Sequence, residues 1–123
     1  MAFKPFESLD VWKEAREFRK AIYGISASLP KREEYVLGNQ MRRAAISITA
    51  NIAEGHGRYH YQETMQFCRA ARGSLSEVRD HLYAALDAGY ISQEAFGKLQ
   101  EQAEKVAKLL NGYINYLGRR KQS

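Results

Sequence analysis

Residues 42–58 read "RRAAISITANIAEGHGR" and combine the pattern of a buried helix with polar residues that such a helix usually lacks. The apolar positions Ala44, Ile48 and Ile52 are spaced by four residues, which puts them on one face of a helix. An asparagine and a glutamate interrupt the aliphatic run, and the stretch closes on a glycine-rich, basic sequence. The pattern predicts a helix with one face in a core and a second face that is polar.

The same three- and four-residue spacing of apolar side chains continues along the rest of the chain. Only two prolines occur, Pro5 and Pro30, and no run alternates with the period of two that is typical of strands. We therefore expect an all-α fold, an antiparallel up-down-up-down four-helix bundle that forms a single domain over residues 1–123. The predicted helices span residues 8–29, 32–55, 61–88 and 93–117.

The predicted helix ends rest on residues that commonly begin or stop helices. Ser8 is a suitable N-cap for the first helix, and Pro30 follows as its stop. The glycines expected to end the other three helices are Gly55 or Gly57, then Gly89, then Gly118.

Composition and charge favour an ordinary globular protein with a mild preference for polyanions. Of the 123 residues, 45% are apolar and 27% are charged, which excludes an intrinsically disordered chain. The net charge of +5 gives a mild preference for polyanionic partners. A single cysteine, Cys68, allows no internal disulfide, and we see no signal peptide and no apolar stretch that could cross a membrane. We therefore expect a cytoplasmic protein without a membrane partner.

A second, mostly polar stripe runs beside the apolar face of the second predicted helix, at Gln40, Ala44, Ser47, Asn51 and Glu54. The third helix carries a matching stripe at Phe67, Ala70, Ser74, Glu77 and His81. An antiparallel hairpin about residue 59 would set Ser47 near Ala71 and Gln40 near Glu77. Arg43 would then lie one turn from Glu77, within plausible reach of it.

We interpret these side chains as a structural polar seam, because an unpaired buried charge would be costly. The residues of the polar seam are Gln40, Ser47, Asn51, Glu54, Ser74 and Glu77. Glu54 opposes the helix dipole in the last turn, so Arg58 or Arg72 is expected to compensate it. Gly73 costs about 1 kcal/mol inside a helix relative to alanine, which suggests a close approach there. We expect the second and third helices to be the tightest pair.

Known catalytic and cofactor-binding patterns do not fit the sequence. Glu54 and Glu77 lack the Glu-x-x-His pairs of bundles that hold two metals, and the glycines around His56 make a helical ligand face with His60 improbable. No dinucleotide fingerprint, Walker A sequence or nucleophile elbow occurs. We expect no catalytic residues, no metal, no cofactor and no enzyme activity.

The turn "EGHGRYHYQE" gathers basic and aromatic residues, namely His56, Arg58, Tyr59, His60 and Tyr61. Such interleaving can hold phosphates and stack the bases of single-stranded nucleic acid. Alternatively, the segment is a flexible turn whose rings pack on the bundle end or on a neighbouring subunit.

Two hypotheses about function follow. In the first, the protein is a non-enzymatic oligomer that binds RNA or single-stranded DNA weakly, with Arg42, Arg43 and Arg58 on phosphates and Tyr59 and Tyr61 on bases. In the second, the same arginines are bound to Glu54 and Glu77, and the bundle is a protein–protein interaction scaffold without a nucleic-acid role.

Several stretches together resemble a known family. They are "LGNQMRRAAISITANIAEGHGR", the earlier "LDVWKEA" with Tyr23, the "LP" before the second helix, and "RGSLSEV". They are similar to the four-helix-bundle family encoded in intervening sequences of bacterial 23S ribosomal RNA genes. The positions that match the family pattern are Gln40, Arg42, Arg43, Ser47, Asn51, Glu54, Gly55, Gly57, Arg58, Ser74 and Glu77.

The resemblance implies a small cytosolic bundle that assembles into a homopentameric ring. It also implies a link to accessory proteins of retroelement reverse transcriptases, for which nucleic acid is the suggested partner. Two positions depart from the pattern: Thr49 stands where proline is frequent, and His56 stands where a smaller residue is common.

Overall fold

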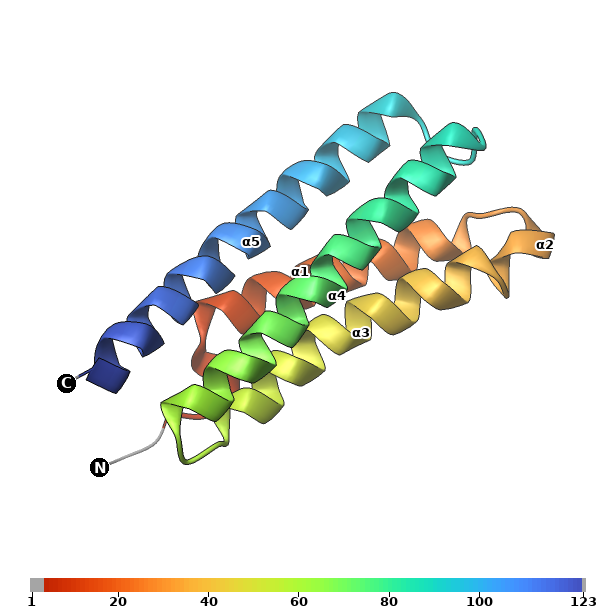
Figure 1. Ribbon diagram of the computed structural model, residues 1–123. Coiled ribbons are helices and arrows are strands. Elements are labelled where there is room, and N and C mark those ends of the chain that lie inside the picture. Colours follow the sequence, from red (N-terminus) through yellow and green to blue (C-terminus); the bar gives the residue numbers. More distant parts are fainter. Residues whose placement is uncertain (1–3, 123) are drawn as a thin grey trace.

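The computed structural model describes residues 4–122, whose regular secondary structure is entirely helical (Figure 1). A short 3-10 helix, η1, comes first, and a one-turn helix, α2, lies between two of the four long helices. The elements in chain order are η1 (Phe6–Ser8), α1 (Asp10–Ala27), α2 (Lys31–Glu34), α3 (Leu37–His56), α4 (Tyr61–Asp87) and α5 (Gln93–Gln122). No strand occurs among these residues, so the predicted all-α bundle is confirmed.

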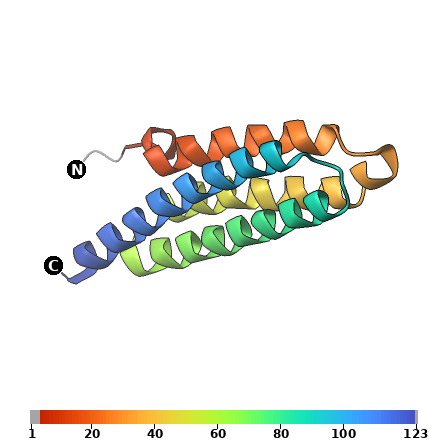
Figure 2. The same cartoon turned by 90° about the horizontal axis from the view of Figure 1, so that it is seen from above.

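Consecutive long helices run in opposite directions and pack side by side (Figures 1 and 2). Helices α1 and α4 each pack against both α3 and α5, so α3 and α5 lie diagonally opposite each other. The most extensive contact joins α3 and α4, which confirms the expectation that these two form the tightest pair. The α3–α4 turn lies at the same end of the bundle as η1 and the end of α5 (Figure 1).

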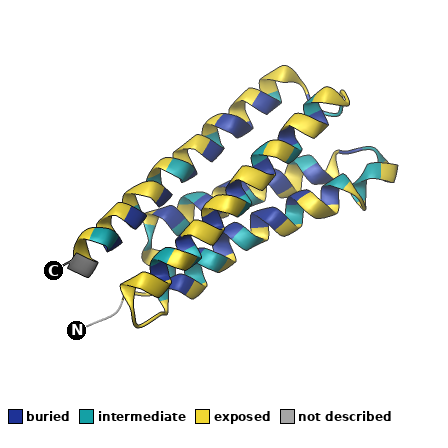
Figure 3. Ribbon diagram, viewed as in Figure 1, coloured by how far each residue is buried: buried dark blue, intermediate teal, exposed yellow. Residues whose placement is uncertain are grey.

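The apolar faces predicted from the spacing meet along the bundle axis (Figure 3). Phe18 and Ile22 of α1 are completely buried, as are Ile48 of α3, Leu82 of α4 and Leu110 of α5. Burying each such side chain contributes about 1.5–3 kcal/mol relative to its exposure to water. This core holds the four helices in place and leaves their outer faces free for other roles.

The start of the first helix differs from its prediction. Ser8 does not cap α1, because its hydroxyl donates a hydrogen bond of 2.7 Å to the carbonyl of Pro5 and so closes the 3-10 turn. Helix α1 begins two residues later at Asp10. It also ends at Ala27, before the predicted stop, and Pro30 instead precedes the first turn of α2.

The second predicted helix, 32–55, is two helices with a break at residues 35–36. Val36 has φ −107° and ψ −83°, outside helical values. The carbonyl of Glu34 accepts a hydrogen bond of 3.0 Å from the Arg42 guanidinium, whereas a continuous helix would use it for the backbone amide four residues on. The Arg42 side chain thus takes the place of a backbone amide at this oxygen. Helix propensity in the sequence does not reveal such a contact between residues eight positions apart.

The predicted glycine stops differ in their backbone. Gly57 caps the end of α3 with a right-handed φ of −80°, so of the two predicted stops it is Gly57 that ends this helix. Gly89, with φ +77°, follows the C-cap of α4 and donates its amide to the carbonyl of Leu86. Gly118, the predicted end of the fourth helix, lies within α5, which runs on to Gln122. Gly55 is buried inside the last turn of α3, and a Cβ added there would lie 2.6 Å from the Cβ of Phe67. Its function is therefore close packing of α3 on α4.

Gly73 does not mediate the close approach that the sequence suggests. It is exposed on α4, and an added Cβ would meet nothing within 4 Å among the residues described. The α3–α4 contact is instead tight at Gly55 and at the buried alanines Ala44, Ala45 and Ala71.

Candidate functional site

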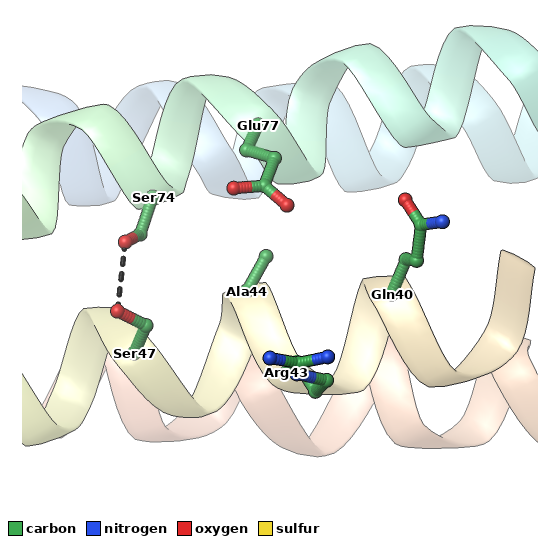
Figure 4. A pocket seen from close by; sticks show the side chains of 6 residues that line it. All are labelled: Gln40, Arg43, Ala44, Ser47, Ser74 and Glu77. Carbon is green, nitrogen blue, oxygen red and sulfur yellow. Dashed lines mark hydrogen bonds between the residues drawn. The ribbon is translucent and has the colours of Figure 1, made fainter.

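Part of the polar seam lines an open groove of about 380 Å³, called here the α3–α4 groove (Figure 4). The lining residues are Gln40, Arg43, Ala44, Ser47, Ser74 and Glu77. One hydrogen bond crosses it, from the Ser74 hydroxyl to the Ser47 hydroxyl, at 2.9 Å. This bond pairs Ser47 with Ser74, one turn along α4 from the Ala71 expected to lie opposite it. Gln40 and Glu77 reach toward the gap above Ala44 from the two helices.

Three seam residues, Asn51, Glu54 and Glu77, find a partner four residues away along the chain. The Asn51 amide donates to the Ser47 carbonyl at 2.8 Å, and the Arg58 guanidinium donates to the Glu54 carboxylate at 3.0 Å. Glu77 pairs with His81, one turn along α4, at 3.2 Å. Of the two arginines expected to compensate Glu54, Arg58 is the one that pairs with it. The Arg72 guanidinium donates to Asn111 instead.

Arg43 does not reach Glu77. Its side chain is exposed on α3, and within residues 4–122 it forms no hydrogen bond or ion pair. The prediction that this arginine and Glu77 buttress the seam is wrong, because the two side chains leave their helices in different directions (Figure 4). Arg43 therefore remains a cation without a protein counter-charge.

Arg42, the neighbour of Arg43 in sequence, points inward. Its guanidinium donates to the Ser26 hydroxyl at 2.9 Å, to the Glu34 carbonyl at 3.0 Å and to the Asn39 side-chain carbonyl. These three oxygens come from α1, α2 and α3, so one side chain ties three elements together. We call this set the Arg42 clasp. Its acceptors are neutral, and both terminal nitrogens of its guanidinium donate within the chain.

The α3–α4 turn presents the aromatic and basic residues that the sequence predicted for it. Tyr59 is 91% exposed, and its ring meets the edge of the His60 ring at 5.0 Å between centroids. The Arg58 guanidinium lies over the Phe67 ring at 4.7 Å while it pairs with Glu54. Arg58 is thus held in place, and its charge is partly compensated.

Tyr61 belongs to a second cluster at the same end, which the sequence did not reveal. It is hydrogen-bonded to Arg120 of α5, and this bond is the main cause that raises the pKa of the guanidinium above its usual value. Tyr116 and Tyr113 stack nearby, with 6.5 Å between their ring centroids. The extension of α5 beyond Gly118 therefore brings a further cation to the turn.

His56 fastens the chain's first described residues to this end of the bundle. Its Nε2 lies 2.7 Å from the Lys4 carbonyl, and its Nδ1 lies 3.1 Å from the Tyr113 hydroxyl. Burial, with a smaller contribution from the nearby Cys68, Tyr116 and Tyr61, raises the pKa of Tyr113 to about 12. These contacts join residues more than 50 positions apart, so no local sequence pattern could have indicated them.

A pocket of about 470 Å³, called here the end pocket, opens beside His56. It is lined by Lys4, Pro5, Phe6, Ala53, His56, Gly57, Arg58 and Tyr59. Its floor is largely apolar, while Lys4 and Arg58 supply positive charge and Tyr59 supplies a free ring. This combination suits a flat apolar group that carries a negative charge.

Residues 4–122 contain no group of three or more His, Cys, Asp or Glu side chains placed to hold a metal ion. No helix in this part of the chain is both long and apolar enough to cross a membrane.

These features define a class: small four-helix bundles with an aromatic, basic surface at the end that carries the central turn. The sequence model of the family described as "23S rRNA-intervening sequence protein" matches residues 7–112, and the chain belongs to this family. The resemblance noted in the sequence is thereby confirmed.

A solved structure from Bacteroides thetaiotaomicron, a protein of unknown function from the S23 ribosomal protein family, shares the fold. It has a TM-score of 0.79 and 24% sequence identity, and the match covers 85% of this chain and 97% of that one. None of the curated proteins compared with the chain matches it. Neither the family description nor the structural relative names an enzymatic activity.

Proposed function

We propose that this protein is a non-enzymatic oligomer that binds single-stranded nucleic acid, RNA or DNA, weakly through the end of the bundle that carries the α3–α4 turn. The observation that carries the proposal is the Tyr59 ring, 91% exposed beside Arg58 and the end pocket. A free ring next to a cation offers a base a stacking partner and a phosphate a counter-charge. Tyr61 and Arg120 extend the same surface.

The arginines of the original hypothesis contribute unequally to this proposal. Arg42 is taken up by the clasp, so it is left out of the binding surface. Arg58 keeps a role because its guanidinium has donors beyond the one that pairs with Glu54. Arg43 is exposed at the α3–α4 groove and is a separate candidate for phosphate contact.

The oligomer is a part of the proposal that rests on the family. Homopentameric rings are what the family resemblance implies, and each weak site would be repeated around such a ring, so avidity would raise the overall affinity. Size-exclusion chromatography with light scattering tests this directly. We expect a mass close to five times the 14.1 kDa of one chain. A monomer at micromolar concentration would contradict it.

Binding is tested by fluorescence anisotropy with labelled twelve-nucleotide oligo-U and oligo-dT. We expect affinity that falls steeply with salt, with a slope of about 0.7 for each phosphate contact in a log–log plot. The double variant R58Q/Y59A should bind about tenfold or more weakly, because a stacked base contributes about 1–3 kcal/mol.

The matched control is R32Q/Y35A, which removes an exposed arginine and an exposed tyrosine from the opposite end of the bundle. It should bind like the wild-type protein. Equal losses in the two double variants, or no wild-type binding to either oligonucleotide at 50 mM salt (about a third of physiological strength), would overturn the proposal.

The interaction-scaffold hypothesis also has an observation in its favour. The Arg58 charge is partly compensated by Glu54, and the α3–α4 groove offers hydrogen-bonding groups together with one cation, Arg43, and one carboxylate, Glu77, a mixture suited to another protein. Protein purified at low salt distinguishes the two. Co-purified polynucleotide that is lost at high salt favours nucleic-acid binding, whereas a clean oligomer without it favours the scaffold.

A further inference from the structure

A surface of cations and aromatic rings runs along α1, on the side that faces α3. Two hydrogen bonds fix how the helices lie: the Arg42 guanidinium donates to Ser26 at 2.9 Å, and the Arg19 guanidinium donates to Thr49 at 2.8 Å. In this antiparallel register Tyr23 comes beside Ile46, and the two residues line a groove together with Arg19 and Lys20. This α1–α3 groove has a volume of about 550 Å³.

The α1 side of the groove carries more positive than negative charge. Arg16, Arg19 and Lys20 occupy two successive turns, and the Arg16 guanidinium lies 5.7 Å from the centre of the Trp12 ring. Glu17 offsets part of this charge through its 3.3 Å ion pair with Lys20. Glu14 does not, because it turns toward α5 and pairs with Lys105 at 3.1 Å.

From α3 the groove is lined by Ile46, and this helix carries no charged side chain over residues 44–53. Ile46 and Ala50 are exposed and Ala53 is half-buried, although solvent-facing positions of a helix usually carry polar residues. Arg43 lies one turn before Ile46, at the far end of this uncharged face. The groove therefore has an apolar wall opposite a basic, aromatic wall.

The α1–α3 groove and the end pocket are connected through contacts between rings. The Phe6 ring lines the end pocket and meets the edge of the Trp12 ring at 5.1 Å, and Trp12 carries Arg16 over its face. Ala53 lines the end pocket from the α3 side. Cations and rings thus follow one another from Tyr59 at the turn to Tyr23, about halfway along the bundle.

We infer that a single strand bound at the turn continues along the α1–α3 groove, with a base stacked on Tyr23 and phosphates held by Arg16, Arg19 and Lys20. This inference rests on the proposed function, and it assigns to α1 a binding role that neither the family nor the turn provides. Alternation of rings and cations along a groove is how proteins hold a strand without reading its sequence. An uncharged opposite wall avoids repelling the phosphates.

The test compares labelled oligo-U of four and twelve nucleotides, bound to the full-length protein in fluorescence anisotropy. The wild-type protein should bind the longer strand more tightly, because only this strand fills both the turn and the groove. R16Q/K20Q should lower the salt slope for the twelve-mer by about 0.7 for each cation removed. Y23A should lower the affinity for the twelve-mer about tenfold, whereas the affinity for the four-mer, which binds at the turn, stays unchanged.

Two control variants match these changes away from the groove. K98Q/K108Q removes two exposed lysines from α5, diagonally across from α3, and Y35A removes an exposed ring at the far end. Circular dichroism at increasing temperature confirms that all variants are folded.

Each result has a distinct meaning. If R16Q/K20Q and Y23A bind like these controls while R58Q/Y59A loses affinity, the α1–α3 groove does not bind the strand. The binding site at the turn would then remain supported. A wild-type protein that binds neither oligonucleotide would overturn the proposed function and the groove together.

Discussion

The two ends of helix α3 use arginine in opposite ways. Near the start, Arg42 is half-buried and donates to three neutral oxygens of its own chain. Just past the end, Arg58 lies on a ring at the surface beside a fully accessible tyrosine. The comparison teaches that the residue type does not decide between stability and binding. The decisive factor is whether oxygens of the chain itself surround the guanidinium.

The largest effect should come from breaking the Arg42 clasp. Arg42→Ala removes three hydrogen bonds from a charged donor and leaves the Glu34 carbonyl without this partner. We expect the free energy of unfolding to fall by about 3 kcal/mol. Urea denaturation measures the change, and Arg43→Ala is the control, with an expected loss below about 0.5 kcal/mol. Similar losses in both variants would erase the distinction between the inward and the outward arginine.

A smaller effect is expected from Gly55, beneath the turn. In Gly55→Ala the new Cβ would lie 2.6 Å from the Cβ of Phe67, so α3 and α4 must shift apart. This overpacking should cost about 2 kcal/mol. Gly73→Ala, with open space around it, should instead gain about 0.5–1 kcal/mol from helix propensity. If thermal denaturation shows that Gly55→Ala is more stable than the wild-type protein, the close packing of α3 on α4 at Gly55 is contradicted.

The buried thiol under the turn end predicts a loss of stability at high pH. Burial raises the pKa of Cys68 from 9.0 to about 11, and the nearby Arg69 lowers it only in part. Folding therefore favours the neutral thiol, so its contribution is complete below pH 9 and is lost as the pH rises toward 11. We expect a loss of about 1–2 kcal/mol across this window.

Urea denaturation at both limits of that window measures the loss, and Cys68→Ala is the comparison. The variant should lose less stability than the wild-type protein over the same window, although Tyr113 still adds a decline at its upper limit. Parallel pH profiles of the two proteins would show that the thiol has no such role.

The smallest effect should come from Tyr59. A ring that is 91% exposed contributes little to folding, so Tyr59→Ala should change the free energy of unfolding by less than about 0.5 kcal/mol. Differential scanning calorimetry can resolve this. A large destabilisation would mean that the ring is covered, for example by a second copy of the chain, and is not free to stack on a base.

The sequence predicted the four long helices and their core because apolar spacing reports directly which side of a helix is buried. Ile48 and Ile52 were both placed inside on this basis and are fully buried. Helix ends were harder, because Gly89 and Gly118 are the same residue in the sequence and only the first adopts a positive φ. The break before α3 depends on Arg42, which lies eight residues from the carbonyl it engages.

The candidate site was predictable only where its residues are neighbours in sequence. Arg58, Tyr59 and Tyr61 lie within four positions, so their grouping in one turn follows from the chain alone. Arg120 and Lys4 join them through contacts with Tyr61 and His56 that span more than 50 residues. Arg43 and Glu77 show the opposite error: the two faces were predicted correctly, but side-chain direction and register keep the charges apart.

The position of the described chain ends has a practical consequence for handling the protein. Lys4 and the last turn of α5 lie beside the α3–α4 turn, so an affinity tag fused to either terminus would crowd the surface around Tyr59. The connection between α4 and α5, where Gly89 turns the chain, lies at the opposite end. A fluorophore or purification tag inserted there would leave the aromatic end unobstructed, and a protein opened at this connection by circular permutation would do the same.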